Sequence, residues 1–167
     1  MCLLCSNKRR KLEVFNILSV PVDNVENTLA SLQEEEVVDI ECPKCKSAQA
    51  MSQIKIVKWL EILIIHFKWY KLVFDHNHVA AEVECNDRHV VLTENLKARH
   101  TIYELRSIIM HSGSYSSGHY TNLSKHENNW FYISDQSVKI ANSITEELSK
   151  AGSLAYLMFF NKAMQPQ

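Results

Sequence analysis

The sequence predicts an α+β fold, in which a mostly antiparallel sheet with few short helices carries a zinc-binding subdomain. Short runs of β-branched and aromatic residues recur along the 167-residue chain, with turn residues between them. Only two segments, 27–36 and 143–152, have helical character. Two Cys-x-x-Cys pairs supply four metal ligands.

The composition is that of a globular chain with a substantial core, since 46% of its residues are hydrophobic and 22% are charged. The 18 basic and 19 acidic residues leave a net charge of −1, so no overall field attracts nucleic acid or anionic lipid. We therefore expect a protein partner or substrate and no nucleic acid. The apolar run at 62–67 is much shorter than the roughly 20 residues of a membrane helix, and the N-terminus lacks the apolar core of a signal peptide. We expect no membrane segment and a cytoplasmic location.

The four paired cysteines are Cys2, Cys5, Cys42 and Cys45. Each pair places two thiolates on one tight turn, and two such turns facing each other give zinc a tetrahedral shell of four sulfurs. A shell of four protein ligands leaves no open position, so this zinc would be structural. Reduced free thiols or a redox pair are the alternatives, and two matched pairs favour zinc. Cys85 is interpreted as a packed thiol.

The 36 residues between the two cysteine pairs are expected to form strands and a helix of their own before the chain returns to the metal site. The segment 11–22 is predicted as a strand that Pro21 ends, from its β-branched and aromatic content. A helix is predicted over 27–36, with Asn27 as a candidate N-cap. A strand over 37–42 would lead back to the second pair.

The rest of the chain is predicted to be mainly strands. Segments 51–60 and 61–70 are expected as consecutive strands, the second buried on both faces because it is nearly continuous in apolar residues. Further strands are expected over 101–112, 119–124, 129–134, 137–141 and 154–161. Ser143 and Glu146 form a capping box, which predicts a helix from Ser143 to near Gly152.

The stretch HSGSYSSGHYTNL, residues 111–123, holds two of the three glycines of the chain, Gly113 and Gly118. Glycine suits backbone that takes a positive φ or that another chain approaches closely. His119 follows the second glycine directly. This pattern indicates either a loop shaped for a bound segment or a plain hairpin loop with a surface histidine.

Taken in order, the two Cys-x-x-Cys pairs, LEILIIHFKWY, HSGSYSSGHYT, NNWFYISDQSV and LAYLMFF resemble the C-terminal half of the ubiquitin-specific protease family of deubiquitinases. The resemblance runs from Cys2 to about Asn161. It implies the papain-like cysteine protease fold of this family, built as fingers, palm and thumb. Residues 1–57 would be the zinc-binding fingers, 58–162 the palm and 163–167 a tail, which together form one incomplete catalytic domain.

The resemblance makes His119 the catalytic histidine, and it assigns the third triad position to Ser134. Asp135 takes the following position. This pattern is similar to the mitochondrial outer-membrane branch of the family, which uses a Cys-His-Ser triad; a damaged triad is the alternative. A serine hydroxyl can accept the ring N–H, but its neutral bond is weaker than that of a carboxylate by about 1 kcal/mol. Asp135 would supply a charge nearby.

By the same resemblance, Gly113, Gly118 and Tyr120 would line the channel that receives the extended tail of ubiquitin. The nucleophile of the family lies in a Gly-Asn-Thr-Cys-Tyr box, and no such box occurs in these 167 residues, so the thumb with its catalytic cysteine would be absent.

We therefore expect a thiol-dependent deubiquitinase that hydrolyses the isopeptide bond at the ubiquitin C-terminus, present as a fragment that is inactive alone. The alternative is a non-catalytic ubiquitin-binding or scaffolding module. By the same resemblance, N-terminal parts outside this fragment would allow the protein to associate with the nucleus or the mitochondrial surface.

Overall fold

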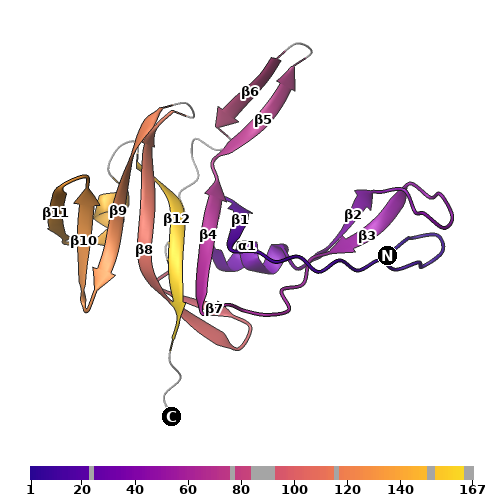
Figure 1. The fold of residues 1–167 in the computed structure, drawn as a ribbon, viewed down its shortest axis with the longest axis horizontal. Coiled ribbons are helices and arrows are strands. Elements are labelled where there is room, and N and C mark those ends of the chain that lie inside the picture. The colour runs from indigo at the N-terminus through magenta and orange to yellow at the C-terminus, as the bar shows by residue number, and fades with distance from the viewer. Residues whose placement is uncertain (23–24, 76–77, 84–92, 115–116, 150–152, 164–167) are drawn as a thin grey trace.

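The computed structural model describes residues 1–22, 25–75, 78–83, 93–114, 117–149 and 153–163 (Figure 1). Within them, one eight-stranded sheet, two two-stranded sheets and two short helices make up the fold. The predicted α+β class, with mostly antiparallel strands and few helices, is confirmed. Cys85, interpreted above as a packed thiol, lies outside the described residues.

The large sheet has the strand order β1-β4-β12-β8-β9-β10-β11, with β7 beside the start of β8. All of its neighbouring strands are antiparallel except β1 and β4, which run parallel. The bounds are β1 (Ile17–Pro21), β4 (Ile62–Lys68), β7 (Asn95–Ala98), β8 (Thr101–Gly113), β9 (Gly118–His126), β10 (Asn129–Ser134), β11 (Ser137–Ala141) and β12 (Ser153–Lys162).

One face of this sheet, called here the core face, carries the hydrophobic core. Its strand residues are almost fully buried: Val20, Leu63, Ile65, Phe67, Ile108, Met110, Leu123, Met158 and Phe160. Helix α1 (Val25–Ser31) adds Val25 and Leu29 to this core, and helix α2 (Ile144–Ser149) adds Ile144. Helices this short are unstable alone, so burial of their apolar sides against the sheet stabilises them.

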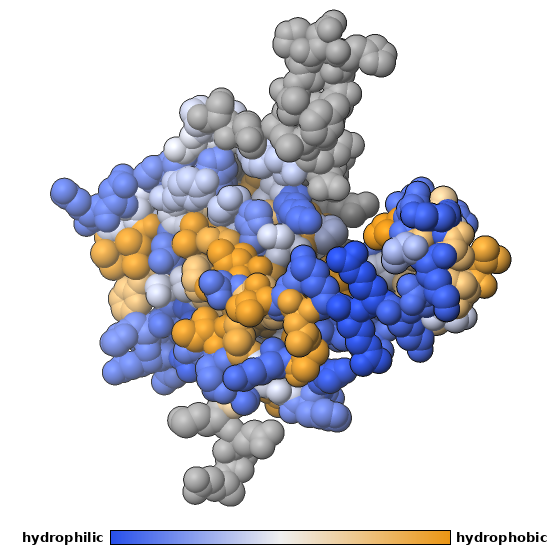
Figure 2. Space-filling model, turned by 45° about the vertical axis from the view of Figure 1, so that its right-hand side comes forward, coloured by the Kyte–Doolittle hydropathy of each residue, from blue (hydrophilic) through white to orange (hydrophobic). Residues whose placement is uncertain are grey.

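The opposite face, called here the open face, is far less buried. Ile64, Ile109, Leu157 and Phe159 are partly buried there, and Tyr120 is 54% exposed. Figure 2 shows an apolar area across the middle of the molecule. The prediction that β4 is buried on both faces was therefore wrong. Both helices pack on the core face, so the alternate residues of β4 that point to the open face are only partly buried.

A two-stranded sheet of β2 (Glu35–Asp39) and β3 (Gln49–Gln53) forms a finger at the side of the large sheet (Figure 1). The helix predicted over 27–36 forms instead over Val25–Ser31, so Asn27 lies inside it and is not its N-cap. It is shorter than predicted because residues 32–34 turn the chain and β2 begins at Glu35. The strand predicted over 51–60 pairs only as far as Gln53 and belongs to this finger.

Only the second half of the predicted strand 11–22 forms a ladder, and it ends at Pro21 as expected. Residues 1–57 thus contribute the finger and also β1 and α1, which pack with the large sheet. The boundary between fingers and palm at residue 57 stays a prediction.

A hairpin of β5 (Tyr70–Asp75) and β6 (His78–Val83) projects from one end of the sheet (Figure 1). It starts after Trp69, where β4 ends and the indole Nε1 donates a hydrogen bond to the carbonyl of Ala155 at 2.7 Å. At α2 the predicted N-cap is confirmed, since Ser143 Oγ accepts a hydrogen bond from the N–H of Glu146 at 3.4 Å. Neither helix in the described ranges has the length and apolar character needed to span a bilayer.

Candidate catalytic site and metal centre

The four paired cysteines meet at the tip of the finger. The distance from Cys2 Sγ to Cys45 Sγ is 3.5 Å, the distance from Cys5 Sγ to Cys42 Sγ is 3.7 Å, and all four sulfurs lie within 4.8 Å of one another. Four sulfurs at the Zn–S bond length of about 2.3 Å in a tetrahedron stand about 3.8 Å apart. The predicted metal cluster is therefore confirmed, and its donor set fits zinc.

The two cysteine turns have the same backbone conformation. In the first, the N–H of Ser6 donates to the carbonyl of Cys2 at 3.1 Å; in the second, the N–H of Lys46 donates to the carbonyl of Cys42 at 2.9 Å. Ser6 and Lys46 both have a positive φ, 55° and 62°. This repeated geometry presents both sulfurs of each pair on the same side of a turn.

The electrostatics of the cluster favour a bound cation. Backbone N–H groups of Cys45 and Lys44 point at the sulfur of Cys42 and lower its pKa to about 6. The N–H of Ser47 also lowers the pKa of Cys45, but the sulfur of Cys5, then burial, and then the sulfurs of Cys2 and Cys42 raise it to about 12. Several thiolates in contact repel each other, so they ionise together only around a cation such as Zn²⁺. Bound zinc would hold the two turns together.

His119 and Ser134 meet at the other site. His119 is the second residue of β9 and Ser134 is the last residue of β10, and His119 Nε2 lies 2.9 Å from Ser134 Oγ. Asp135 follows in the turn to β11 with a φ of 49°, and its Oδ2 lies 3.9 Å from the same nitrogen. The three predicted catalytic residues are thus brought together, with Ser134 as the closer partner of the ring.

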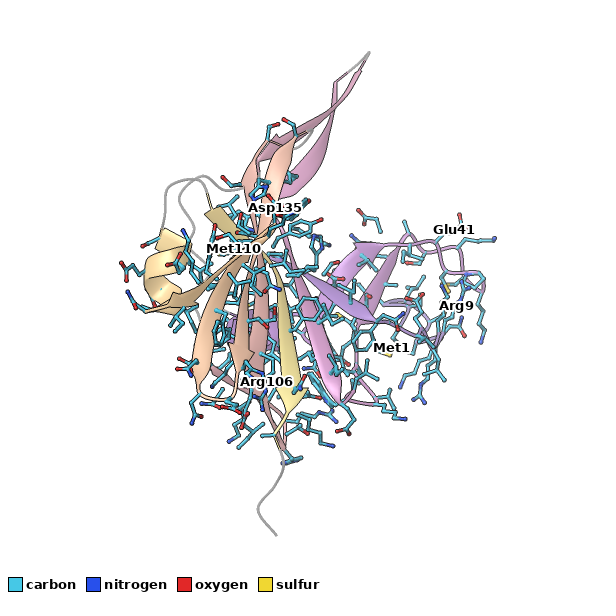
Figure 3. The ribbon with its side chains drawn as sticks, turned by 60° about the vertical axis from the view of Figure 1, so that its left-hand side comes forward. Met1, Arg9, Glu41, Arg106, Met110 and Asp135 are labelled. Atoms are coloured by element: carbon cyan, nitrogen blue, oxygen red, sulfur yellow. The ribbon has the colours of Figure 1, made fainter. Side chains whose placement is uncertain are left out.

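The hairpin of β9 and β10 explains this contact. The two strands pair antiparallel from Asn129 opposite His126 to Ile133 opposite Asn122. Beyond that pair the start of β9 and the end of β10 continue side by side. Figure 3 shows Asp135 at the end of the sheet from which β5 and β6 project, whereas Met1, Arg9 and Glu41 lie on the finger. The catalytic candidates and the metal cluster are therefore separate sites.

At both glycines of the hairpin between β8 and β9, neighbouring atoms of the chain leave no room for a side chain. Gly113 has a φ of 137° and pairs with Gly118, whose Cα would lie 2.5 Å from a Cβ added at Gly113. A Cβ added at Gly118 would lie 2.1 Å from His111 Nε2. The roles of Gly113, Gly118 and Tyr120 toward a substrate stay predictions.

A row of polar and aromatic side chains crosses the open face beside this hairpin, and the sequence did not reveal it. Ser19 Oγ lies 3.1 Å from His66 Nδ1, and the ring of His66 packs edge-on against Tyr156 at 4.8 Å. Tyr156 in turn contacts Tyr120, and His111 packs between them. These residues come from five strands, so only the strand order brings them together.

The comparison with protein families shows which family this chain belongs to. The model of the family described as ubiquitin carboxyl-terminal hydrolase matches residues 5–160. The chain belongs to this family. Ubiquitin carboxyl-terminal hydrolase 3 of Homo sapiens is 28% identical over 189 residues, which cover 95% of this chain and 36% of the relative. Ubiquitin carboxyl-terminal hydrolase 4 of Arabidopsis thaliana is 30% identical over 155 residues, which cover 83% and 41%. The chain therefore spans well under half of these hydrolases.

Solved structures confirm the fold expected of a ubiquitin carboxyl-terminal hydrolase. One chain of a yeast SAGA DUB module superposes on this chain with a TM-score of 0.82 at 23% identity, over 99% of this chain and 39% of the other. The module of Ubp8, Sgf11, Sus1 and Sgf73 bound to monoubiquitin gives a TM-score of 0.77 at 24% identity, over the same shares. The predicted arrangement of a zinc-bearing finger on an antiparallel palm is that of this family.

Proposed function

We propose that this chain supplies the fingers and palm of a cysteine-type deubiquitinase, which hydrolyses the isopeptide bond at the C-terminus of ubiquitin. The observation that carries the proposal is the hydrogen bond between His119 Nε2 and Ser134 Oγ in a chain of the ubiquitin carboxyl-terminal hydrolase family.

In this geometry the two ring nitrogens of His119 have different roles, one in orienting the ring and one in proton transfer. In the tautomer that carries its proton on Nε2, the ring donates to Ser134 Oγ, and Nδ1 is left to take the proton of a thiol. The same nitrogen would later return the proton to the leaving amine. The carboxylate of Asp135, 3.9 Å from Nε2 and 80% exposed, would add only a weak, water-screened attraction for the imidazolium that forms between these steps.

The thiol has to come from the Gly-Asn-Thr-Cys-Tyr box of the family, which does not occur in these 167 residues. The finger and the palm would hold ubiquitin, and its tail would approach His119 past Gly113, Gly118 and Tyr120. Monoubiquitin bound to a SAGA DUB module of the same fold supports ubiquitin as the partner.

A second candidate function is ubiquitin binding without catalysis. The serine at the third triad position favours it, since its neutral hydroxyl stabilises an imidazolium less than a carboxylate does. Both functions are compatible with the fact that these 167 residues contain no nucleophile box.

A chimeric protein distinguishes the two functions. It joins a thumb segment of the family, with its nucleophile box, to residues 1–167 and is called here the thumb-joined protein. We expect this protein to cleave a fluorogenic ubiquitin amide, and His119→Ala to abolish cleavage. His126→Ala, at the exposed far end of β9, is the matched control and should keep the wild-type rate. Ubiquitin binding without cleavage would select the second candidate, and the absence of both would contradict both.

A further inference from the structure

His111 is a buried polar residue of β8 whose ring touches both neighbours of His119 along the chain. Its side chain is 6% exposed. A Cβ at Gly118 would lie 2.1 Å from its Nε2 and 2.8 Å from its Cε1, so the edge of the ring rests directly against the backbone before His119. On the other side of His119, the ring of Tyr120 lies 4.7 Å from the His111 ring between centroids.

The backbone around His119 is held mainly from the side of β8. The ladder between β9 and β10 ends at Asn122, three residues after His119. The ladder between β8 and β9 continues to the pair of Gly113 and Gly118. The hydrogen bond from His119 to Ser134 on β10 therefore extends past the last backbone pair of those two strands, and its geometry depends on how firmly β8 holds the start of β9.

His111 cannot itself meet the reacting atoms on the side of His119. It pairs with Tyr120, whereas Ser112 pairs with His119, so His111 and His119 point to opposite faces of the sheet. Any influence of His111 passes through the backbone of Gly118 and the ring of Tyr120.

We propose that His111 is a positioning residue, which holds the start of β9 so that the ring of His119 stays within hydrogen-bond distance of Ser134. The catalytic part of this inference rests on the function proposed above. A catalytic group has to be held to within a fraction of an ångström, and a side chain locked by packing achieves this. An imidazole fits because its small edge reaches the glycine backbone; alanine would leave a gap there.

The test uses the 167-residue chain with ¹⁵N-labelled histidines, at a pH where His119 is neutral. Long-range ¹H–¹⁵N spectra report which ring nitrogen carries the proton. In the wild type we expect widely separated signals for Nδ1 and Nε2 of His119, as for one fixed tautomer. In His111→Ala the separation should shrink toward that of a mixture of tautomers, as it should in Ser134→Ala.

A double-mutant comparison separates positioning from a general loss of stability. Adding His111→Ala to Ser134→Ala should change the His119 signals little further, because the hydrogen bond that His111 supports is already gone. Ile109→Ala is the matched control: it truncates a partly buried residue of the same strand and face, and it should leave the His119 signals unchanged. His111→Gln serves as the second variant if the alanine variant does not fold.

Unchanged His119 signals in the folded His111 variant, or an equal change in the control, would overturn the proposal. The measurement needs neither ubiquitin nor a thiol. If the thumb-joined protein failed to bind or cleave ubiquitin, only the proposed function would fail; the positioning of His119 would be decided by the spectra alone.

Discussion

At the scale of single residues, the third triad position carries the sharpest question. Ser134 Oγ lies 2.9 Å from His119 Nε2, whereas Asp135 Oδ2 lies 3.9 Å away and its side chain is 80% exposed. An exposed charge at that distance is screened by water, so the serine is the better candidate for orienting the ring.

The first prediction is that Ser134→Ala lowers turnover in the thumb-joined protein by about fivefold or more, the equivalent of one neutral hydrogen bond of about 1 kcal/mol. Ser134→Asp should keep or raise turnover, because a carboxylate also accepts the ring N–H. Steady-state hydrolysis of a ubiquitin amide measures both. Asp135→Asn tests the rival: if it abolishes turnover while Ser134→Ala is silent, the orienting role belongs to Asp135.

The sequence could point to these residues only through the resemblance, because a histidine and a serine 15 positions apart carry no signal of contact by themselves. The tight hairpin of β9 and β10 supplies the contact. His111 could not be assigned a role in advance, since its contact with Gly118 depends on the register between β8 and β9.

At the scale of elements, the spacing of the cysteines was sufficient to predict the metal cluster, because two residues between ligands fix a local turn. The helix over 27–36 was predicted too long for the opposite reason. Glu34, Glu35 and Glu36 favour a helix, but the last two enter the ladder of β2 with β3. A pairing partner distant in the sequence decided the structure there, and no local pattern reports it.

The second prediction concerns the finger. Cys42→Ser removes one of four thiolates, so bound zinc should fall from one ion per chain to none, and the melting temperature should drop. Both follow because metal binding and folding of such small sites are coupled. Elemental analysis of the purified chain and a thermal melt measure these effects. Cys85→Ser is the control and should keep the zinc; a Cys42→Ser variant with full zinc would contradict the four-cysteine site.

The third prediction concerns the pairing of β1 with β4, where His66 stands opposite Ser19. Burial, with a smaller contribution from Lys68, lowers the pKa of His66 below its usual 6.5. The unfolded state then binds more protons than the folded state as the pH falls below about 6.5, so the free energy of unfolding decreases on acidification. His66→Gln should flatten this dependence, measured by urea denaturation at several pH values.

His100→Gln is the matched control for that experiment, because it changes an exposed histidine between β7 and β8. The control should keep the wild-type slope of stability against pH. An equal flattening in both variants would show that His66 is not the residue responsible.

At the scale of the whole molecule, the two helices pack on the core face, and among the described residues none forms a helix on the open face (Figures 1 and 2). Partly buried apolar residues extend over β4, β8 and β12 there, and Tyr120 stands beside them. Apolar surface of this kind typically belongs to an interface with another segment or molecule.

The fourth prediction is that the 167-residue chain alone does not react with a ubiquitin probe that carries a thiol-reactive group at its C-terminus. His119 has an orienting partner but no thiol of the family box to activate, and triad members act as a unit. The thumb-joined protein should be labelled by the same probe, as seen by a mass shift. Labelling of the chain alone that Cys85→Ala removes would reveal a different nucleophile.

The parallel pairing of β1 with β4 predicts that zinc binding in the finger affects the rate of folding. Cys5 precedes β1 by 11 intervening residues, and Cys45 precedes β4 by 16, so two short arms leave the metal cluster in the same direction and end in paired strands. Parallel strands are usually slow to pair because a long loop has to close first. Zinc would join Cys2 and Cys5, which precede β1, to Cys42 and Cys45, which precede β4, and would thereby bring the two arms together in advance. Refolding of the palm in stopped-flow experiments should therefore be faster with zinc present than with a chelator.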